Sequence, residues 1–167
     1  LVGSEMCIRD RNGEALEKFC NALKDGNSEV VEQSLNNYLK RTISIRDTFV
    51  KKQMKENFYH GILLGILGFQ QNWGVSSNKE SGDGYSDILI ETEDQETGII
   101  IEIKYAETGN LEAVSEDALK QIEDRRYEEQ LLEEGVEHIL KYGIAFYKKK
   151  CKVIAVSYTH LRAHETL

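Results

Sequence analysis

Residues 84–107, GYSDILIETEDQETGIIIEIKYAE, decide the fold of this 167-residue chain. Their hydrophobic positions alternate with a period of two, which predicts strands at residues 85–91 and 99–105 joined by a polar hairpin. Three charged residues stand among the isoleucines: Asp87, Glu102 and Lys104. Because an uncompensated charge is costly to bury, charged residues in such a setting are normally paired or bound to a metal. We therefore expect these three residues to form a site.

Helical patterns precede and follow these two strands. We expect helices at residues 14–24, 28–40, 48–69 and 115–133, and further strands at residues 73–77, 142–147 and 152–155. The expected order is a helix pair, a long helix, three strands, a helix and two strands. This order predicts an α/β fold with a mixed central sheet flanked by helices. In the long helix, Gly61, Gly65 and Gly68 form a stripe that we expect another element to approach closely.

Strand geometry suggests how the three charged residues are arranged. Side chains in a strand alternate between faces, so Glu102 and Lys104 point to one face, while Ile99, Ile101 and Ile103 point to the other, where we expect a helix. Pairing of the two strands as a hairpin can place Asp87 beside Glu102. Two carboxylates and one ammonium group would then converge at one end of a sheet.

This set of groups suits Mg²⁺, a hard cation that takes oxygen ligands and keeps several waters, and Mn²⁺ is a possible substitute. The ion would polarise a phosphodiester and lower the pKa of a water molecule. Lys104 would orient or help to deprotonate the attacking water, or stabilise the charge that develops on phosphorus. A plain structural ion pair between Glu102 and Lys104 is the simpler interpretation of the same residues.

The charge of the chain limits its binding partners. A formal net charge of −8 argues against a large electrostatic surface for nucleic acid. A local surface stays possible, because basic residues form three clusters: Lys51, Lys52 and Lys55; Arg125 and Arg126; Lys148, Lys149, Lys150 and Lys152. Each cluster is typical of a solvated face or a hairpin tip, and only a position around a cleft would make it a binding surface.

Two further classes are disfavoured by the composition. No apolar run approaches the roughly 18 residues that a membrane span needs. Cys20 and Cys151 offer neither a disulfide framework nor a zinc-ligand pattern, so we expect a reducing, cytoplasmic location.

The charged residues form a pattern: Asp87, a spacer and then Glu102-Ile103-Lys104, on strands between two helices. This pattern resembles that of the PD-(D/E)XK nuclease superfamily. The similar stretches are ENFYHGILLGIL, SNKESGDGYSDILIE, IIIEIKYAE, ALKQIEDRRYEEQ and YGIAFYKKKCKV, which cover most of residues 55–153. The resemblance implies a restriction-endonuclease-like core of a helix, three strands, a helix and a further strand. It is closer to a bacterial branch in which such a domain follows an AAA-type, ATPase-like module.

The resemblance also implies roles for particular residues. Asp87 and Glu102 would be the carboxylates that bind the metal, the carbonyl of Ile103 a further ligand, and Lys104 the catalytic lysine. The residue before Asp87 is Ser86, where the name of the superfamily has proline, a substitution that is common among its members.

Two helical residues join this set through the resemblance alone. Gln121 matches the glutamine that many of these nucleases place near the site to orient substrate or water, and Tyr127 is a support for it or part of the core. Glu56 resembles the acidic residue that some members contribute to the metal site. Without the resemblance, Gln121 is an ordinary polar residue of a helix, and Glu56 is a surface carboxylate.

The chain is interpreted as a fragment in four parts. Residues 1–11 and 156–167 resemble translated sequencing-adaptor sequence, residues 12–47 form a helical segment that ends a preceding module or caps the domain, and residues 48–155 form the nuclease-like domain. We expect a Mg²⁺-dependent nuclease acting on nucleic acid, with DNA as the expected substrate, from a larger ATPase-linked protein. One alternative is a catalytically silent module that binds nucleic acid. Another is an interaction domain that docks an ATPase or another protein through the helix pair.

Overall fold

The structure is a computed structural model that describes residues 2–44, 51–78, 87–124 and 127–160. Within these ranges the side chains of residues 2–12, 53, 78, 87, 127 and 130 are not described. The helices are α1 (Val2–Asp25), α2 (Ser28–Thr42), α3 (Lys52–Leu67), α4 (Leu111–Asp124) and α5 (Tyr127–Glu133). The strands are β1 (Gly74–Asn78), β2 (Asp87–Glu91), β3 (Thr97–Tyr105), β4 (His138–Tyr147) and β5 (Lys150–Thr159). Ser86 and the cluster of Arg125 and Arg126 lie outside the described residues.

The predicted order of elements is confirmed, with differences in where they begin and end. The first helix begins at Val2 and not at residue 14, and the helix predicted at residues 115–133 is divided into α4 and α5. The last strand continues to Thr159, which pairs with His138 at the start of β4. Local periodicity locates an element, whereas its ends depend on which neighbours it meets in the folded chain.

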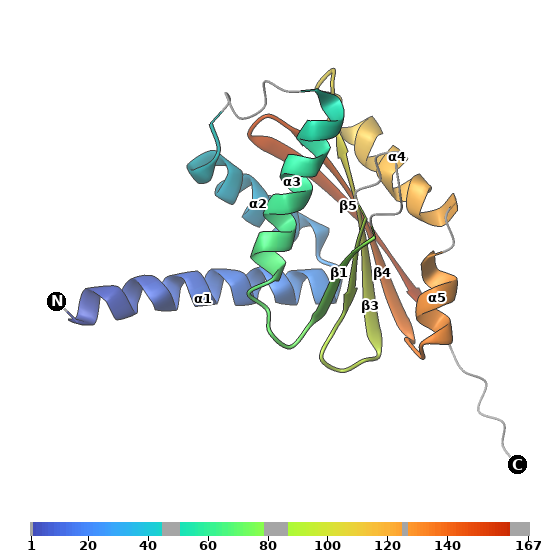
Figure 1. Ribbon diagram of the computed structural model, residues 1–167, viewed down its shortest axis with the longest axis horizontal. Helices are drawn as coiled ribbons and strands as arrows, with labels where there is room; N and C mark the ends of the chain where they lie inside the picture. Colours follow the sequence, from blue (N-terminus) through green and yellow to red (C-terminus); the bar gives the residue numbers. More distant parts are fainter. Residues whose placement is uncertain (1, 45–50, 79–86, 125–126, 161–167) are drawn as a thin grey trace, which may run out of the picture.

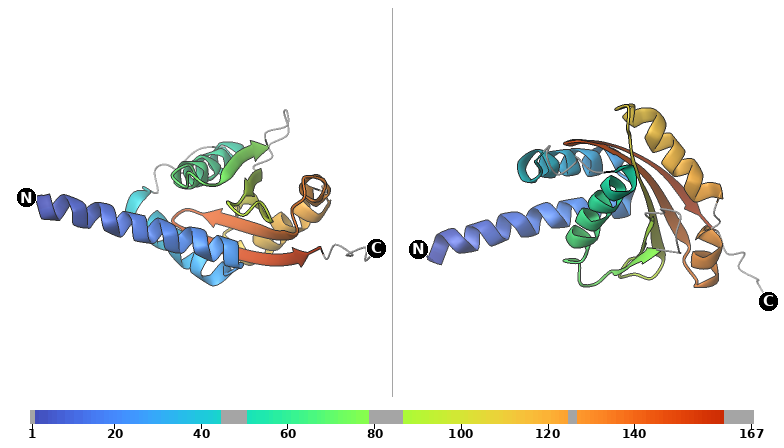
Figure 2. Two further views of the ribbon diagram at one scale, coloured as in Figure 1. Left: turned by 90° about the horizontal axis from the view of Figure 1, so that it is seen from below. Right: turned by 45° about the horizontal axis from the view of Figure 1, so that its top comes forward.

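The five strands form one mixed sheet in the order β1-β2-β3-β4-β5. Neighbouring strands are antiparallel except β3 and β4, which are parallel and therefore need the long crossover that α4 and α5 provide. Figure 1 shows α1, α2 and α3 on one face of the sheet and α4 and α5 on the other. In the views of Figure 2, the N-terminal part of α1 projects beyond the sheet. The predicted fold class, a mixed sheet flanked by helices as in a restriction-endonuclease-like core, is confirmed.

Strand β3 is central in the sheet and buried along almost its whole length. As predicted, Ile99, Ile101 and Ile103 point to one face, where they pack with α1, α2 and α3 in the larger hydrophobic core. The residues between them face a smaller cluster formed with α4 and α5. Glu102 and Lys104 alternate with the isoleucines and so lie on this second face.

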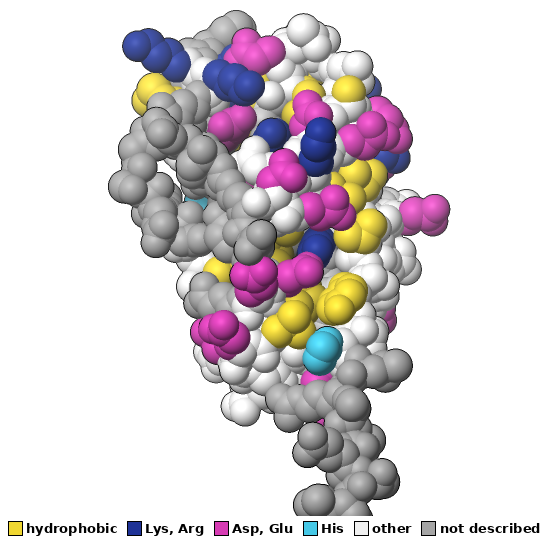
Figure 3. Space-filling view, turned by 90° about the vertical axis from the view of Figure 1, so that its right-hand side faces the viewer, with side chains coloured by type: hydrophobic (Ala, Val, Ile, Leu, Met, Phe, Trp, Pro, Cys, Tyr) yellow, Lys and Arg dark blue, Asp and Glu magenta, His cyan; other side chains and the backbone are white. Residues whose placement is uncertain are grey.

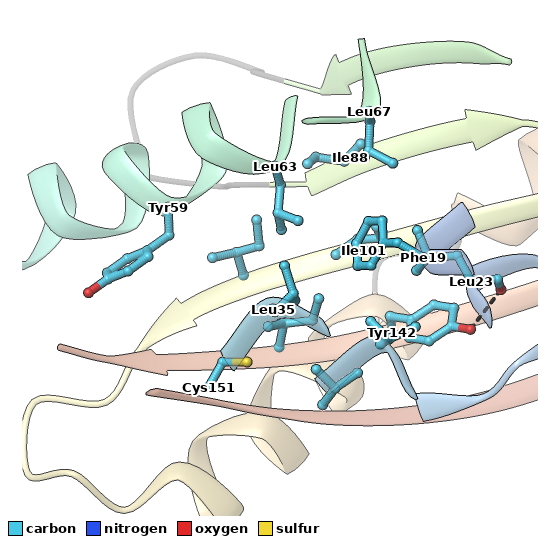
Figure 4. Packing of buried hydrophobic residues seen from close by; sticks show 14 of the residues in the cluster. Phe19, Leu23, Leu35, Tyr59, Leu63, Leu67, Ile88, Ile101, Tyr142 and Cys151 are labelled. Carbon is cyan, nitrogen blue, oxygen red and sulfur yellow. Dashed lines mark hydrogen bonds between the residues drawn. The ribbon is translucent and has the colours of Figure 1, made fainter. Parts of the chain in front are cut away.

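The larger core joins segments that are distant in the sequence. Figure 4 shows side chains from α1, α2, α3 and four of the strands packed together. The hydroxyl of Tyr142, on β4, donates a hydrogen bond to the carbonyl oxygen of Leu23, on α1, at 2.7 Å. This bond satisfies a hydroxyl group that is fully buried.

Helix α4 lies directly against the backbone of β4 at Gly143. A Cβ atom at this position would be 2.3 Å from the carbonyl oxygen of Ser115 and 2.8 Å from the backbone nitrogen of Leu119, so only glycine fits. The close approach predicted for the glycines of α3 is wrong. Gly61 and Gly65 are exposed, and nothing lies within 4 Å of a Cβ atom built at either.

Asp94 organises the hairpin between β2 and β3. Its carboxylate accepts hydrogen bonds from the hydroxyl of Thr92 at 2.7 Å and from the backbone N–H groups of Glu96 and Thr97 at 2.9 and 3.0 Å. Lys24, near the end of α1, forms an ion pair with it at 3.0 Å. Burial acting alone would raise the pKa of Asp94, but these interactions outweigh it and hold the pKa below its usual value.

Helix α2 covers the edge of the sheet at β5. The side chain of Asn36 accepts a hydrogen bond from the N–H of Cys151 at 2.8 Å and donates one to its carbonyl oxygen at 3.3 Å. The N–H of Val153 donates to the carboxylate of Glu32 at 2.9 Å. Side chains of the same molecule thus occupy backbone groups that an open strand edge would offer to another chain.

The outer surface carries charges of both signs. On the face over α4 and α5, acidic and basic side chains are interspersed with hydrophobic ones (Figure 3). Cys20 and Cys151 are buried and free. Of the helices in the described ranges, none combines the length and the apolar composition that crossing a membrane requires.

Candidate functional site

The site begins where β2 starts to pair with β3. Asp87 is the Cα partner of Glu102, so the hairpin register expected from the sequence is confirmed for the backbone. At the other end of the ladder the N–H of Thr92 donates to the carbonyl oxygen of Thr97 at 3.0 Å. Hydrogen-bonded and non-hydrogen-bonded pairs alternate along the ladder, so Asp87 and Glu102 form a non-hydrogen-bonded pair, the kind in which the two Cα atoms lie closer together. The side chain of Asp87 is not among those described.

Glu102 is a buried carboxylate with one oxygen unsatisfied. Its side chain is only 2% exposed. The amide of Gln121, on α4, donates a hydrogen bond to Oε1 at 2.8 Å, whereas Oε2 has no hydrogen-bond partner in the described part of the chain. A buried polar oxygen without a partner costs about 1–3 kcal/mol, and a charged one costs more. Oε2 is therefore an acceptor whose setting favours a cation.

Gly143 brings Gln121 within reach of Glu102. The parallel register makes Gly143 the Cα partner of Glu102, on the neighbouring strand. Because Gly143 has no side chain, α4 lies against the sheet beside Glu102, and Gln121 is on the same helix. The resemblance placed Gln121 near the site, and the structure places its amide in contact with Glu102.

Lys104 is half-buried and follows Glu102 by two residues, so both lie on the same face of β3. Glu102 accepts its described hydrogen bond from Gln121 and not from Lys104. The structural ion pair that was the simpler interpretation of Glu102 and Lys104 is therefore absent among the described contacts.

Strand β3 continues past Glu102 to Tyr105, whereas β2 begins at Asp87, the partner of Glu102. The backbone of residues 103–105 therefore has no partner on β2. The N–H of Ala106 donates to the carbonyl oxygen of Phe146 on β4 at 2.8 Å. Backbone groups alternate along a strand, so those of Ile103 and Tyr105 point to the opposite side, toward the start of β2. The carbonyl of Ile103 is thus directed into the same region as the pair of Asp87 and Glu102.

Glu56, on α3, reaches this region from the other face of the sheet. Its carboxylate accepts a hydrogen bond from the N–H of Tyr105 at 3.1 Å. Burial raises the pKa of the Glu56 carboxyl above its usual value. The N–H of Tyr105 and the positive charges of Lys52 and Lys104 act in the opposite direction, and Glu107 adds to the increase. Glu56 is therefore no isolated surface carboxylate.

Sequence reasoning gave His60 no role at this site. One helical turn after Glu56, it is only 2% exposed, and its Nε2 lies 3.1 Å from the hydroxyl oxygen of Ser77 on β1. Ser77 is in turn the Cα partner of Ile88, which follows Asp87. The contact helps to fix α3, and with it Glu56, against the strands that begin the site. The spacing of four residues from Glu56 was the only signal in the sequence.

The residues present fit a hard divalent cation. Oxygen atoms are the ligands that such a cation prefers, and the region offers the free Oε2 of Glu102, the carboxylate of Glu56 and the carbonyl of Ile103. Among the described side chains, which exclude Asp87, there is no group of three or more His, Cys, Asp or Glu residues that could hold a metal ion. Asp87 lies across from Glu102 in the register and would add a further carboxylate.

Comparison with known proteins identifies the family. A family model described as the PD-(D/E)XK nuclease superfamily matches residues 54–156, which is more than half of the chain. The chain belongs to the PD-(D/E)XK nuclease superfamily, and the predicted resemblance is confirmed. Members of this superfamily are generally nucleases and typically use a divalent metal ion, which indicates nucleic acid as the class of substrate. No curated protein matches the chain.

Proposed function

We propose that this chain is a Mg²⁺-dependent nuclease domain that hydrolyses phosphodiester bonds, with DNA as the expected substrate. The observation that carries the proposal is the buried Oε2 of Glu102, which has no partner in the described structure and lies at the register position opposite Asp87. A buried carboxylate needs a compensating charge. Members of the superfamily typically use a divalent metal ion, and such an ion would provide that charge.

The ion would be held by oxygen atoms of four residues: Asp87, Glu102, Ile103 through its carbonyl, and Glu56. All four belong to the region where β2 begins and α3 crosses β3. Mg²⁺ suits carboxylate and carbonyl ligands and is commonly held by few protein groups, and Mn²⁺ accepts the same ligands. When bound, the ion would supply Lewis-acid polarisation of the phosphodiester and would acidify a water molecule.

The other residues would position the reactants. Lys104 lies on the face of Glu102, where its ammonium group would orient the attacking water or stabilise negative charge on the phosphoryl oxygens. Water would form the new bond to phosphorus as the bond to the leaving oxygen breaks, and that oxygen would gain a proton. Gln121 would hold Oε1 of Glu102 and so direct Oε2 toward the cation.

We also propose that residues 12–47 are a cap on this domain and not a separate module. The described buried residues of this segment belong to the same hydrophobic core as β3 and β4: Phe19, Cys20, Ala22, Leu23, Val31, Leu35, Leu39 and Ile43. Linkage to an ATPase-like module, expected from the resemblance, remains part of the proposal for the protein from which the chain derives.

A cleavage assay on the full chain tests the proposal. Single-stranded, duplex and branched DNA and RNA would be incubated with Mg²⁺, Mn²⁺ or a chelator. We expect cleavage with either metal and none with the chelator, and a loss of at least about a hundredfold in Lys104→Ala, because a positioned catalytic group contributes about 10²–10⁴. The control is Lys18→Ala, an exposed lysine of α1, which should retain full activity. Equal rates in the two variants would refute the role of Lys104.

A second candidate is a nuclease-like module that binds nucleic acid or metal without turnover. The net charge of −8 favours the metal-binding form of this candidate, because an acidic chain attracts cations and repels phosphate over most of its surface. Binding in the same assay without cleavage of any substrate would support it. The third candidate, docking of a partner through the helix pair, is weakened because the core of this chain already buries several apolar residues of the described part of that pair, among them Leu23 and Leu35.

A further inference from the structure

The turn between β4 and β5 contains a lysine in an unfavourable backbone conformation. Tyr147 pairs with Lys150, so the two strands are joined by Lys148 and Lys149 alone. Lys148 has a φ of 52°, in the left-handed region that glycine adopts freely and that other residues adopt at a cost. Two-residue hairpin turns require a positive φ at this position, which is why glycine is common there. A lysine thus occupies the position where glycine would fit better.

Contacts connect this turn to the candidate site. The hydroxyl of Tyr59, on α3, donates a hydrogen bond to the carbonyl oxygen of Lys148 at 2.6 Å. The ring of Tyr59 is stacked on those of Phe146 and Tyr105, with centroids 4.4 and 6.0 Å away. The backbone of Tyr105 in turn donates to Glu56. The turn is therefore fixed relative to the carboxylates of the site, at the same end of the sheet.

Two lysines from different elements each lie over one of two neighbouring aromatic rings. The ammonium group of Lys55 lies 4.5 Å from the ring centroid of Tyr105, and that of Lys148 lies 5.0 Å from the ring centroid of Tyr147. The two tyrosine rings are themselves 6.0 Å apart. We call Lys55, Lys148 and Tyr147 the lysine–tyrosine surface; Tyr105, which is only 4% exposed, is buried beside it.

Ion pairs distinguish three other lysines of the described chain from the two lysines of this surface. Ion pairs engage Lys24 with Glu93 and Asp94, Lys141 with Glu128, and Lys152 with Glu32 and Glu112. Neither Lys55 nor Lys148 forms an ion pair with any described residue. Their positive charges are therefore available to an anionic ligand.

We propose that the lysine–tyrosine surface binds the phosphate backbone of a nucleic acid and leads the strand from the candidate site toward the β4–β5 turn. The proposal rests on the proposed function in taking nucleic acid as the ligand. Affinity for nucleic acid depends mainly on lysine and arginine contacts with phosphates, and an acidic chain needs such contacts concentrated near its site. Lys51 and Lys52, exposed at the start of α3, extend the same positive region.

The test separates the charge of Lys148 from its effect on the fold. In Lys148→Gly the backbone strain is relieved, so we expect the midpoint of thermal unfolding to stay the same or rise. Binding of a labelled single-stranded DNA oligonucleotide to the full chain would be measured with chelator present, which prevents metal-dependent cleavage, over a range of salt concentrations. We expect weaker binding and a slope of log K against log salt that is smaller by about 1.

Gln95→Gly is the matched control. Gln95 has a φ of 57° and lies in the hairpin at the opposite end of the sheet, so its replacement relieves the same kind of strain without removing a charge. We expect unchanged binding and an unchanged salt slope. Lys55→Gln tests the other lysine and should lower the slope by a similar amount, with about twice the reduction in the double variant.

Two outcomes would overturn the proposal: no binding of the oligonucleotide by the unaltered chain, or equal affinity and salt slope in Lys148→Gly and Gln95→Gly. Its failure is distinguishable from that of the proposed function. Binding that depends on these lysines without any cleavage would support the surface and refute the nuclease. Cleavage by a chain whose affinity for the oligonucleotide does not change when either lysine is replaced would support the nuclease and refute the surface.

Discussion

Glu102 is hydrogen-bonded through one carboxylate oxygen to Gln121, and its other oxygen has no partner among the described residues. In the metal-free protein this arrangement opposes folding, since a buried carboxylate oxygen lacks a hydrogen-bond partner. A bound cation would remove the penalty. Stability and metal affinity are therefore coupled at a single side chain, and the coupling can be measured without observing catalysis.

We predict that Mg²⁺ raises the midpoint of thermal unfolding of the unaltered chain and that Glu102→Gln abolishes this shift. A ligand that binds only the folded state stabilises it by about 1.4 kcal/mol for each tenfold excess over its dissociation constant. The glutamine variant lacks the buried charge, so its metal-free form should be no less stable than the parent. Glu17→Gln, at an exposed position on α1, should keep the full shift. The same shift in both variants would contradict metal binding by Glu102.

At the scale of single elements, packing of α4 on β4 depends on one glycine, and the hairpin between β2 and β3 depends on one aspartate. Gly143 permits the helix backbone to touch the strand, and Asp94 satisfies backbone N–H groups that the tight turn leaves without strand partners. One contact lies beside the site, whereas the other lies at the far end of the sheet. Substitutions at these two positions should therefore differ in their effect on function.

We predict that Gly143→Ala destabilises the fold and disturbs the site together. Its Cβ would lie 2.3 Å from the carbonyl oxygen of Ser115, so α4 must move and carry Gln121 away from Glu102. Overpacking of this kind costs about 1–3 kcal/mol. Gly61→Ala is the control: with open space around it on α3, alanine should stabilise the helix by about 0.5–1 kcal/mol. Denaturant unfolding would measure both, and equal stability of the two variants would contradict the prediction.

The hairpin gives a pH-dependent prediction. The pKa of Asp94 is held below its ordinary value of 3.8, so its charged form stabilises the folded state above that pH, and the contribution is lost as the pH falls through the lower folded value. Asp94→Asn should therefore be less stable than the parent at neutral pH, with a difference that shrinks below about pH 4. Urea unfolding between pH 2 and pH 7 would measure it. A difference that stays constant over this range would show that the charge is unimportant.

At the scale of the whole molecule, the candidate site draws on both faces of the sheet. Glu56 and Tyr105 are 49 residues apart in the sequence, and Tyr59 and Lys148 are 89 apart, yet both pairs are hydrogen-bonded at the same end of the sheet. Helix α3 supplies groups from one face and α4 from the other, with β3 between them. No segment of the chain contains the site by itself.

This distribution explains what could be predicted from the sequence. The period of two in residues 84–107 was sufficient for β2, β3 and the pairing of Asp87 with Glu102, because strand alternation and a hairpin are local properties. The close approach at Gly143 was missed, and that at Gly61 and Gly65 was wrongly expected, because the space around a glycine is determined by elements far away in the chain. The contact of Lys148 with Tyr59 is tertiary and no local pattern reveals it, and the contact of His60 with Ser77 was indicated only by the spacing of His60 from Glu56.

The parallel pairing of β3 with β4 has a consequence for the order of events during synthesis. The strands β1, β2 and β3 are joined by short connections and can pair as soon as they leave the ribosome, but β4 emerges only after α4 and α5. Until then, the growing chain presents one uncovered edge of its buried central strand, which carries Glu102. A charged residue in the middle of such an edge discourages pairing with other nascent chains, so the same carboxylate would protect the protein before it is enclosed.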